Sequence, residues 1–269
     1  MKRALDEVRI IFAVAWYNLK LTYRYPANVF FAIAMPIVFV AVGAIFAPLV
    51  GSDELVMFTG GEASLPLYMA AGLMMWLISN SSAGLAKAVE MEISWGTLSS
   101  NLQTPAPLAS IFAGLALSNL LYGGTMSAII AVPLLMLVPV QYPQLLAVNT
   151  ALAIVLFLGV GMIYASLALL WKKVSGVIQV LSFVEQFFCG VFLPVRLIPV
   201  GLRWFAYALP QTWAIDGVRS ALLGVEPIAT RIMGTVILLV LATATNTAGL
   251  ILLKRAERVA RARGISDSY

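Results

Sequence analysis

Long apolar runs alternate with short polar interruptions along almost the whole chain. A bilayer takes about 20 apolar residues to cross, and six of the runs reach or approach that length. The expected spans cover approximately residues 27–50, 66–86, 107–138, 145–170, 174–192 and 229–253. The pattern therefore predicts an all-α, polytopic membrane protein, with one transmembrane domain of six helices over residues 1–269.

Residues 1–25 precede the first run and repeat apolar side chains every three or four positions, which places these side chains on one helical face. Basic residues flank this apolar face, and Pro26 follows it. Such a helix suits the membrane interface; the alternative is a juxtamembrane helix packed on its own protein. The face consists of Leu5, Val8, Phe12, Trp16, Leu19 and Tyr23.

Residues 193–225, between the fifth and sixth runs, are too apolar for a solvent loop. Several prolines and glycines also interrupt them too often for one spanning helix. Two short helices that enter the outer leaflet and return satisfy both facts, because non-spanning backbone at that depth must be buried in protein or line a wet cavity. The alternative is an interfacial loop anchored by Trp204, Tyr207 and Trp213. Within the segment, the i, i+3 spacing of Asp216 and Arg219 suggests an ion pair.

The longest polar interruption in the first half of the chain is residues 90–105, with the sequence EMEISWGTLSSNLQTP. With six spans, this stretch lies on the same side as both termini. That side carries 13 of the 17 Lys and Arg residues, so both termini and the stretch are predicted to be cytoplasmic. The remaining four are Arg196, Arg203, Arg219 and Arg231. We interpret residues 90–105 as a cytoplasmic docking element.

The composition of the chain argues against several classes of function. The chain is 61% hydrophobic and 11% charged, with one cysteine, Cys189, and no histidine. These counts exclude a disulfide framework within the chain and a cysteine metal cluster, and they disfavour an intramembrane enzyme. The net charge of +5 follows from basic residues at the chain ends and beside spans, which does not suggest nucleic-acid binding. No G-x-x-x-x-G-K-[ST] phosphate loop is present, so ATP cannot bind by that route.

Glu185 is a carboxylate within the fifth expected span. A charge there costs about 2.5–3.5 kcal/mol on insertion scales, so it should face a partner or water. Two interpretations stay open: Glu185 contacts a cationic substrate along the transport pathway, or it pairs with Arg196 or Arg203. For the polar residues Asn80, Ser81, Ser82 and Gln179, hydrogen bonds between helices are the preferred interpretation.

Two stretches together resemble the ABC-2 family of membrane permeases, the transmembrane subunits of ABC exporters. The first pattern, E-x-E-x-x-x-G-T-L-x-x-x-L-x-T-P, is matched by Glu90, Glu92, Gly96, Thr97, Leu98, Leu102, Thr104 and Pro105. The second is matched by Gly190, Pro194, Pro199, Pro210, Thr212, Asp216, Arg219 and Gly224. Ser99 and Asn101 depart from the family, which often has Glu and Leu at these positions.

The resemblance implies a coupling helix after the second span, seated in a groove of a separate ATPase subunit that binds ATP and Mg. The chain itself would bind no cofactor and would not be an enzyme. It would pair with itself or a related permease in a bacterial or archaeal plasma membrane. The expected cargo is a hydrophobic drug or amphipathic lipid; a polysaccharide or glycolipid is the alternative.

The residues at the start of the docking stretch have expected roles. Glu90 and Glu92 would either pair with basic groups of the ATPase or cap the first turn of the coupling helix. Gly96 would permit a tight turn. Trp95 would fill a pocket of the partner or lie at the level of the lipid headgroups.

Overall fold

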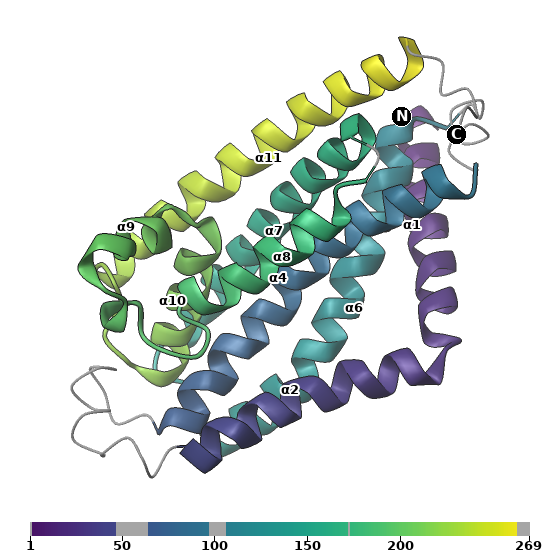
Figure 1. The fold of residues 1–269 in the computed structure, drawn as a ribbon. Coiled ribbons are helices and arrows are strands. Elements are labelled where there is room, and N and C mark those ends of the chain that lie inside the picture. The colour runs from purple at the N-terminus through teal and green to yellow at the C-terminus, as the bar shows by residue number, and fades with distance from the viewer. Residues whose placement is uncertain (1, 47–63, 97–105, 172, 263–269) are drawn as a thin grey trace.

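The computed structural model describes residues 2–46, 64–96, 106–171 and 173–262, and the described parts contain helices and their connections without a strand (Figure 1). This confirms the all-α prediction. The helices are α1 (Lys2–Tyr23), α2 (Pro26–Phe46), α4 (Leu65–Ser94), α6 (Leu108–Leu137), α7 (Pro143–Trp171), α8 (Ser175–Phe188), the 3-10 helix η2 (Val195–Leu197), α9 (Val200–Ala208), α10 (Pro210–Leu223) and α11 (Arg231–Ala262).

Three helices of the described chain are long and apolar enough to cross a membrane: Ser110–Leu137, Pro143–Trp171 and Arg231–Arg261. Two shorter apolar helices cover Val29–Val42 and Ser175–Phe188. Helix α4 has 30 residues, but the polar residues 79–82 interrupt its apolar sequence. The six-span topology therefore stays a prediction.

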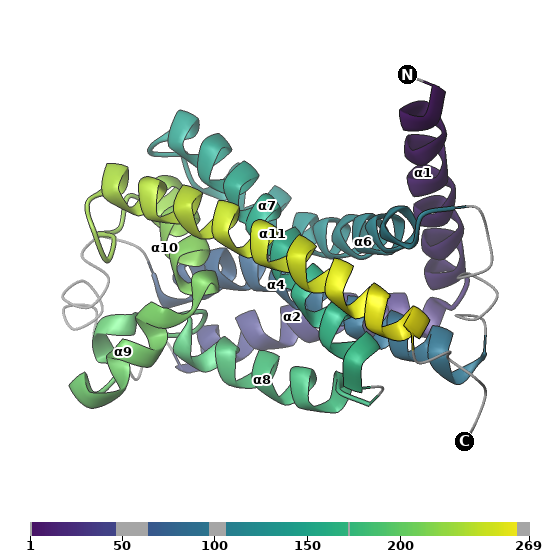
Figure 2. The same ribbon diagram turned by 90° about the horizontal axis from the view of Figure 1, so that it is seen from above.

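Helix α4 lies inside the bundle, with α2, α6, α7, α8 and α10 around it (Figures 1 and 2). Every residue from position 68 to 75 is buried, which fits the apolar character of this part of the helix. Met74 and Met75 therefore pack in the core. Helix α4 contributes to two apolar clusters, one with α10 and the start of α11, the other with the start of α6 and the end of α11.

Small residues let α7 and α11 approach closely, as is common between membrane helices. A Cβ atom added at Gly159 would lie 2.6 Å from the backbone nitrogen of Asn246, and one added at Gly249 would lie 2.8 Å from the Gly159 carbonyl oxygen. The Asn246 amide also donates to the Val155 carbonyl at 2.7 Å. These two helices therefore form a tight pair along one side of the bundle.

The polar residues Asn80, Ser81 and Ser82 of α4 and Gln179 of α8 only partly make the hydrogen bonds between helices that the sequence predicts. Ser82 donates to the Phe157 carbonyl of α7 at 2.8 Å, which confirms a hydrogen bond between helices. Ser81 instead donates to Ile78 of its own helix at 2.6 Å. The Asn80 Oδ1 atom is buried without a partner, and Gln179 is exposed on α8.

Helix α1 projects from the side of the bundle (Figure 2) and packs against α6. Asn18 donates to Ser118 at 2.7 Å, and Gly114 leaves room for the Val14 side chain. The sequence-predicted apolar face points elsewhere: Val8, Phe12, Trp16 and Tyr23 are exposed, and Leu19 is half-buried. A helix over this segment is thus confirmed. It packs on its own protein through one side and leaves the predicted apolar stripe uncovered, and its position at the membrane interface stays a prediction.

Candidate functional site

Helix α4 continues through Glu90 and Glu92 and ends only at Ser94. The helix thus extends past the expected span 66–86, because residues 87–92 are helix formers with neither Pro nor Gly among them. The two carboxylates therefore lie on the last turns of α4 and not at the start of a helix. Gly96, with φ of 70°, follows the end of α4 and confirms the turn expected there.

The Glu90 carboxylate caps a different helix, α8. Its Oε1 accepts hydrogen bonds from the backbone N–H of Val174 and, at 2.5 Å, of Ser175, while its Oε2 accepts from the Ser175 hydroxyl. The side chain of Val174, the residue before α8, makes no cap of its own. A carboxylate at a helix N-terminus satisfies free N–H groups and complements the helix dipole.

The electrostatics of Glu90 agree with this geometry. Burial opposes ionisation of the carboxyl, but the hydrogen bonds from Ser175 and Val174 and the charge of Lys173 outweigh it, so the pKa of Glu90 lies below its usual range. Glu90 is therefore an ionised cap that joins two helices far apart in the sequence.

The end of α4 presents an exposed surface. The Trp95 side chain is 65% exposed and that of Met91 38%, which leaves an aromatic ring without cover at the tip of the helix. Figure 1 shows this tip at the same end of the bundle as the last turns of α11. The other proposed docking residues, Thr97, Leu98, Leu102, Thr104 and Pro105, lie outside the described residues.

The second motif shapes the opposite end of the bundle. Pro194 precedes η2, Pro199 precedes α9, and Pro210 is the first residue of α10. Each proline thus stands where its missing N–H costs least. Gly190 and Gly224 adopt φ of 76° and 73° at the turns after α8 and α10, a conformation that favours glycine. The Thr212 hydroxyl donates to the Ala206 carbonyl at 2.6 Å and so ties α10 to α9.

The expected ion pair between Asp216 and Arg219 is wrong. Asp216 accepts from the Ile228 N–H at 3.0 Å, whereas Arg219 donates to the Val191 carbonyl at 3.1 Å and lies over the Tyr68 ring. The i, i+3 spacing permits contact along one helix, but partners from other segments hold each side chain in a different direction.

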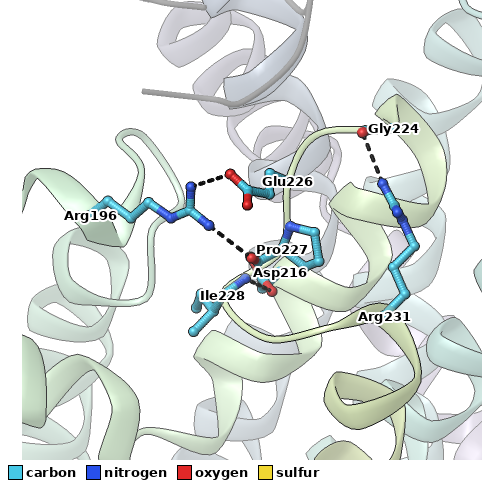
Figure 3. Close-up of polar contacts among 7 residues, drawn as sticks. All are labelled: Arg196, Asp216, Gly224, Glu226, Pro227, Ile228 and Arg231. Atoms are coloured by element: carbon cyan, nitrogen blue, oxygen red, sulfur yellow. Dashed lines mark hydrogen bonds and ion pairs between the residues drawn. The ribbon is translucent and has the colours of Figure 1, made fainter. Parts of the chain in front are cut away.

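The four arginines outside the predicted cytoplasmic face all bind main-chain carbonyl groups. Arg196 donates to Pro227 at 3.0 Å and forms a 2.6 Å ion pair with Glu226, and Arg231 donates to Gly224 at 3.1 Å (Figure 3). Arg203 donates to Ile198 at 2.7 Å. With Arg219, they fasten the turns around α9, α10 and the start of α11.

Glu185 is buried, with 5% of its surface exposed, and accepts a hydrogen bond from the Tyr164 hydroxyl at 3.1 Å. The expected pairing with Arg196 or Arg203 is wrong, because both arginines are occupied by other groups. Within the described chain, Gln186 Nε2 and Gln211 Oε1 are likewise buried, and neither atom has a hydrogen-bond partner. Sequence reasoning missed Tyr164, Gln186 and Gln211, since single polar residues in apolar runs carry no signal of their contacts.

Sequence reasoning also missed Ser175, Tyr68 and Gly72. Ser175 follows a short basic turn and is the first residue of α8, and a Ser at the start of an apolar run is a local signal of a helix start. Tyr68 and Gly72 stand four residues apart in α4 and face Arg219, a relationship that no spacing rule reveals.

A model of the ABC-2 type transporter family matches residues 9–223. The matched region contains the first motif, the second motif up to Arg219, and all the contacts described at the end of α4. A search of curated proteins found no match. The matched family comprises membrane permease domains, which are transport subunits without an ATPase domain.

Proposed function

The chain belongs to the ABC-2 type transporter family, and on that premise we propose that it is the permease subunit of an ATP-driven exporter. It is a multi-pass membrane protein. A separate ATPase subunit would bind ATP and Mg, and a second permease, identical or related, would complete the transporter. The proposed location is the plasma membrane of a bacterium or archaeon.

The observation that carries this proposal is the continuity of α4 from the core to its exposed tip. The same helix is fully buried around residues 68–75 and ends beside an exposed Trp95. Exposed aromatic side chains often anchor protein interfaces. A partner that binds the tip of α4 would therefore act directly on the centre of the bundle.

We propose six spans formed by α2, α4, α6, α7, α8 and α11, with both termini in the cytoplasm. The distribution of Lys and Arg supports this topology. The four arginines on the other face support it too, because each is engaged by main-chain carbonyl groups of the folded protein. We further propose that α9 and α10 form the re-entrant hairpin, since they are short, apolar and joined at Pro210.

The proposed cargo is a hydrophobic drug or an amphipathic lipid. The exposed face of α8 supports this class, because Val177, Val180, Phe183 and Phe187 are all at least half exposed and offer an apolar surface to lipid, cargo or a second permease. A polysaccharide or glycolipid is the alternative cargo. An intramembrane enzyme is the second alternative function.

Trp95→Ala, compared with Trp171→Ala, tests the proposal. Trp171 is also exposed, at 66%, and ends α7. We expect Trp95→Ala to insert normally but to lose the co-purifying ATPase subunit and the transport of a fluorescent short-chain lipid in proteoliposomes, while Trp171→Ala keeps both. Coupled transport that persists in Trp95→Ala would overturn the docking role. Transport of a lipid-linked oligosaccharide in place of the lipid would favour the alternative cargo.

A further inference from the structure

We propose that Glu90 is a positioning residue that transmits movement from the docking end of α4 to α8. This inference rests on the proposed function, because it assumes that an ATPase subunit acts on the tip of α4. It differs from the expected role of Glu90, since the carboxylate binds another helix of its own chain rather than the partner.

The first argument is the direction of the Glu90 contacts. Both carboxylate oxygens are directed at the start of α8, where they accept from two backbone N–H groups and one hydroxyl. Hydrogen bonds to an ionised acceptor are about twice as strong as neutral ones. Glu90 lies in the last two turns of α4, five residues before the exposed Trp95 that follows the helix, so displacement of the tip displaces the cap of α8.

The second argument is a further connection between α4 and α8 at their other ends. Val191 follows α8, and its carbonyl accepts from Arg219, whose guanidinium lies against Gly72 and Tyr68 of α4. A Cβ atom at Gly72 would overlap both the Arg219 Nη2 and the Val191 carbonyl. Helix α4 is thus connected to the start of α8 directly and to its end through one arginine.

The third argument is that α8 has one polar and one apolar face. Its buried side carries Ser182, Glu185 and Gln186, whereas its exposed side carries Val177, Val180 and Phe183. The polar side faces the bundle, where Glu185 accepts the hydrogen bond from Tyr164. Movement of α8 would therefore shift its apolar outer face, which is the surface proposed above for lipid, cargo or a second permease.

The test is hydrogen–deuterium exchange on the complete transporter, the permease with its ATPase subunits in lipid nanodiscs. Exchange at residues 91–96 reports on the tip of α4, and exchange at residues 173–180 reports on the start of α8. Both are compared between the nucleotide-free state and the state trapped with ATP and vanadate.

Glu90→Gln keeps the size of the side chain but loses the charge, and Ser175→Ala loses only one hydrogen bond. Lys87→Gln, which changes an exposed residue one turn earlier on α4, is the matched control.

In the wild type and in Lys87→Gln, we expect nucleotide to change exchange at both segments. In Glu90→Gln, the change at residues 91–96 should persist, the change at residues 173–180 should fall at least threefold, and ATP hydrolysis should continue while transport of the fluorescent lipid falls at least fivefold. In Ser175→Ala, the nucleotide response at residues 173–180 and the transport of the lipid should be intermediate between those of the wild type and Glu90→Gln. An unchanged nucleotide response of α8 in Glu90→Gln would overturn the inference. By contrast, no response at residues 91–96 even in the wild type would contradict the proposed function on which it rests.

A purely structural cap would give a different result. If Glu90 only stabilises α8, exchange at residues 173–180 rises equally with and without nucleotide in Glu90→Gln, and transport per hydrolysed ATP stays at the wild-type value. Glu90→Asp, which restores the charge on a shorter side chain, should recover part of the nucleotide response at α8. Failure of Glu90→Asp to exceed Glu90→Gln in that response would also count against transmission.

Discussion

The guanidinium group of Arg219 in α10 lies over the ring of Tyr68 in α4, with 3.8 Å between its Cζ atom and the ring centroid. Both side chains are buried, at 2% and 5% exposure. A buried cation needs compensation, and here the ring face and the Val191 carbonyl oxygen supply it. This contact fastens the short helix α10 to the central helix of the bundle.

Two substitutions of Tyr68 distinguish the contribution of its ring to stability from the contribution of its hydroxyl. We expect Tyr68→Phe to leave stability nearly unchanged, because the ring face is retained. Tyr68→Leu removes the ring and should cost about 2 kcal/mol or more, the size of a desolvated cation–π contact. Thermal unfolding of the purified permease in detergent measures both. Equal losses in the two variants would show that the ring face is not what holds Arg219.

Gly72 is expected to be intolerant of even one added methyl group. Its Cβ would overlap Arg219 and the backbone of Val191, and backbone cannot move aside as a flexible side chain can. Gly234→Ala in α11 is the control, because a Cβ there meets no atom within 4 Å. We expect a lower melting temperature in Gly72→Ala, whereas Gly234→Ala should gain about 0.5–1 kcal/mol from helix propensity. A melting temperature that rises in both variants would contradict the close packing of α4 and Arg219.

The positions of most helices could be predicted from apolar runs alone. The expected spans 107–138 and 145–170 agree closely with α6, Leu108–Leu137, and α7, Pro143–Trp171. The continuation of α4 past the expected span has a simple cause: hydropathy detects where a helix stops being apolar, not where it stops being helical. Glu90 and Glu92 are polar yet favour the helix, so α4 ends eight residues after the expected boundary, at Ser94.

The contacts of the candidate site could not be predicted in the same way. Prolines and glycines marked the turns around α9 and α10 because their backbone preferences are local. The partners of Glu90 are 84 and 85 residues away, and nothing local encodes such a distance. For Asp216 and Arg219, the local spacing suggested an ion pair. Instead, Asp216 binds the N–H of Ile228 and Arg219 lies over the ring of Tyr68, and both partners come from other segments of the fold.

The Tyr164–Glu185 hydrogen bond should show strong coupling in a double-mutant cycle. Glu185→Leu leaves the Tyr164 hydroxyl buried without its acceptor, which should cost about 1–3 kcal/mol. Glu185→Gln should cost less, because an amide oxygen can still accept. Adding Tyr164→Phe to Glu185→Leu should recover part of the loss, since an apolar pair leaves no unsatisfied group. Additive losses in the double variant, measured by unfolding in detergent, would show that the two groups do not depend on each other.

The cap formed by Glu90 predicts a specific pH dependence of stability. Glu90 lies beyond the end of the proposed span 66–86, and its pKa is lowered in the folded protein. A lowered folded pKa means that the stabilisation is fully present above the unfolded value, about 4.3 for Glu. It is lost as the pH falls through the folded value, where the folded protein also takes up the proton.

The difference in melting temperature between the wild type and Glu90→Gln isolates this effect, because the other carboxylates titrate in both proteins. We expect the wild type to be more stable at pH 7, with a difference that stays constant down to about pH 5 and then shrinks, since a protonated Glu90 resembles glutamine. Lys87→Gln should show no comparable narrowing between pH 5 and 3. A difference that stays constant or widens as the pH falls would mean that the charge of Glu90 does not stabilise the start of α8, and the hydrogen bonds from Val174 and Ser175 would then act only as neutral contacts.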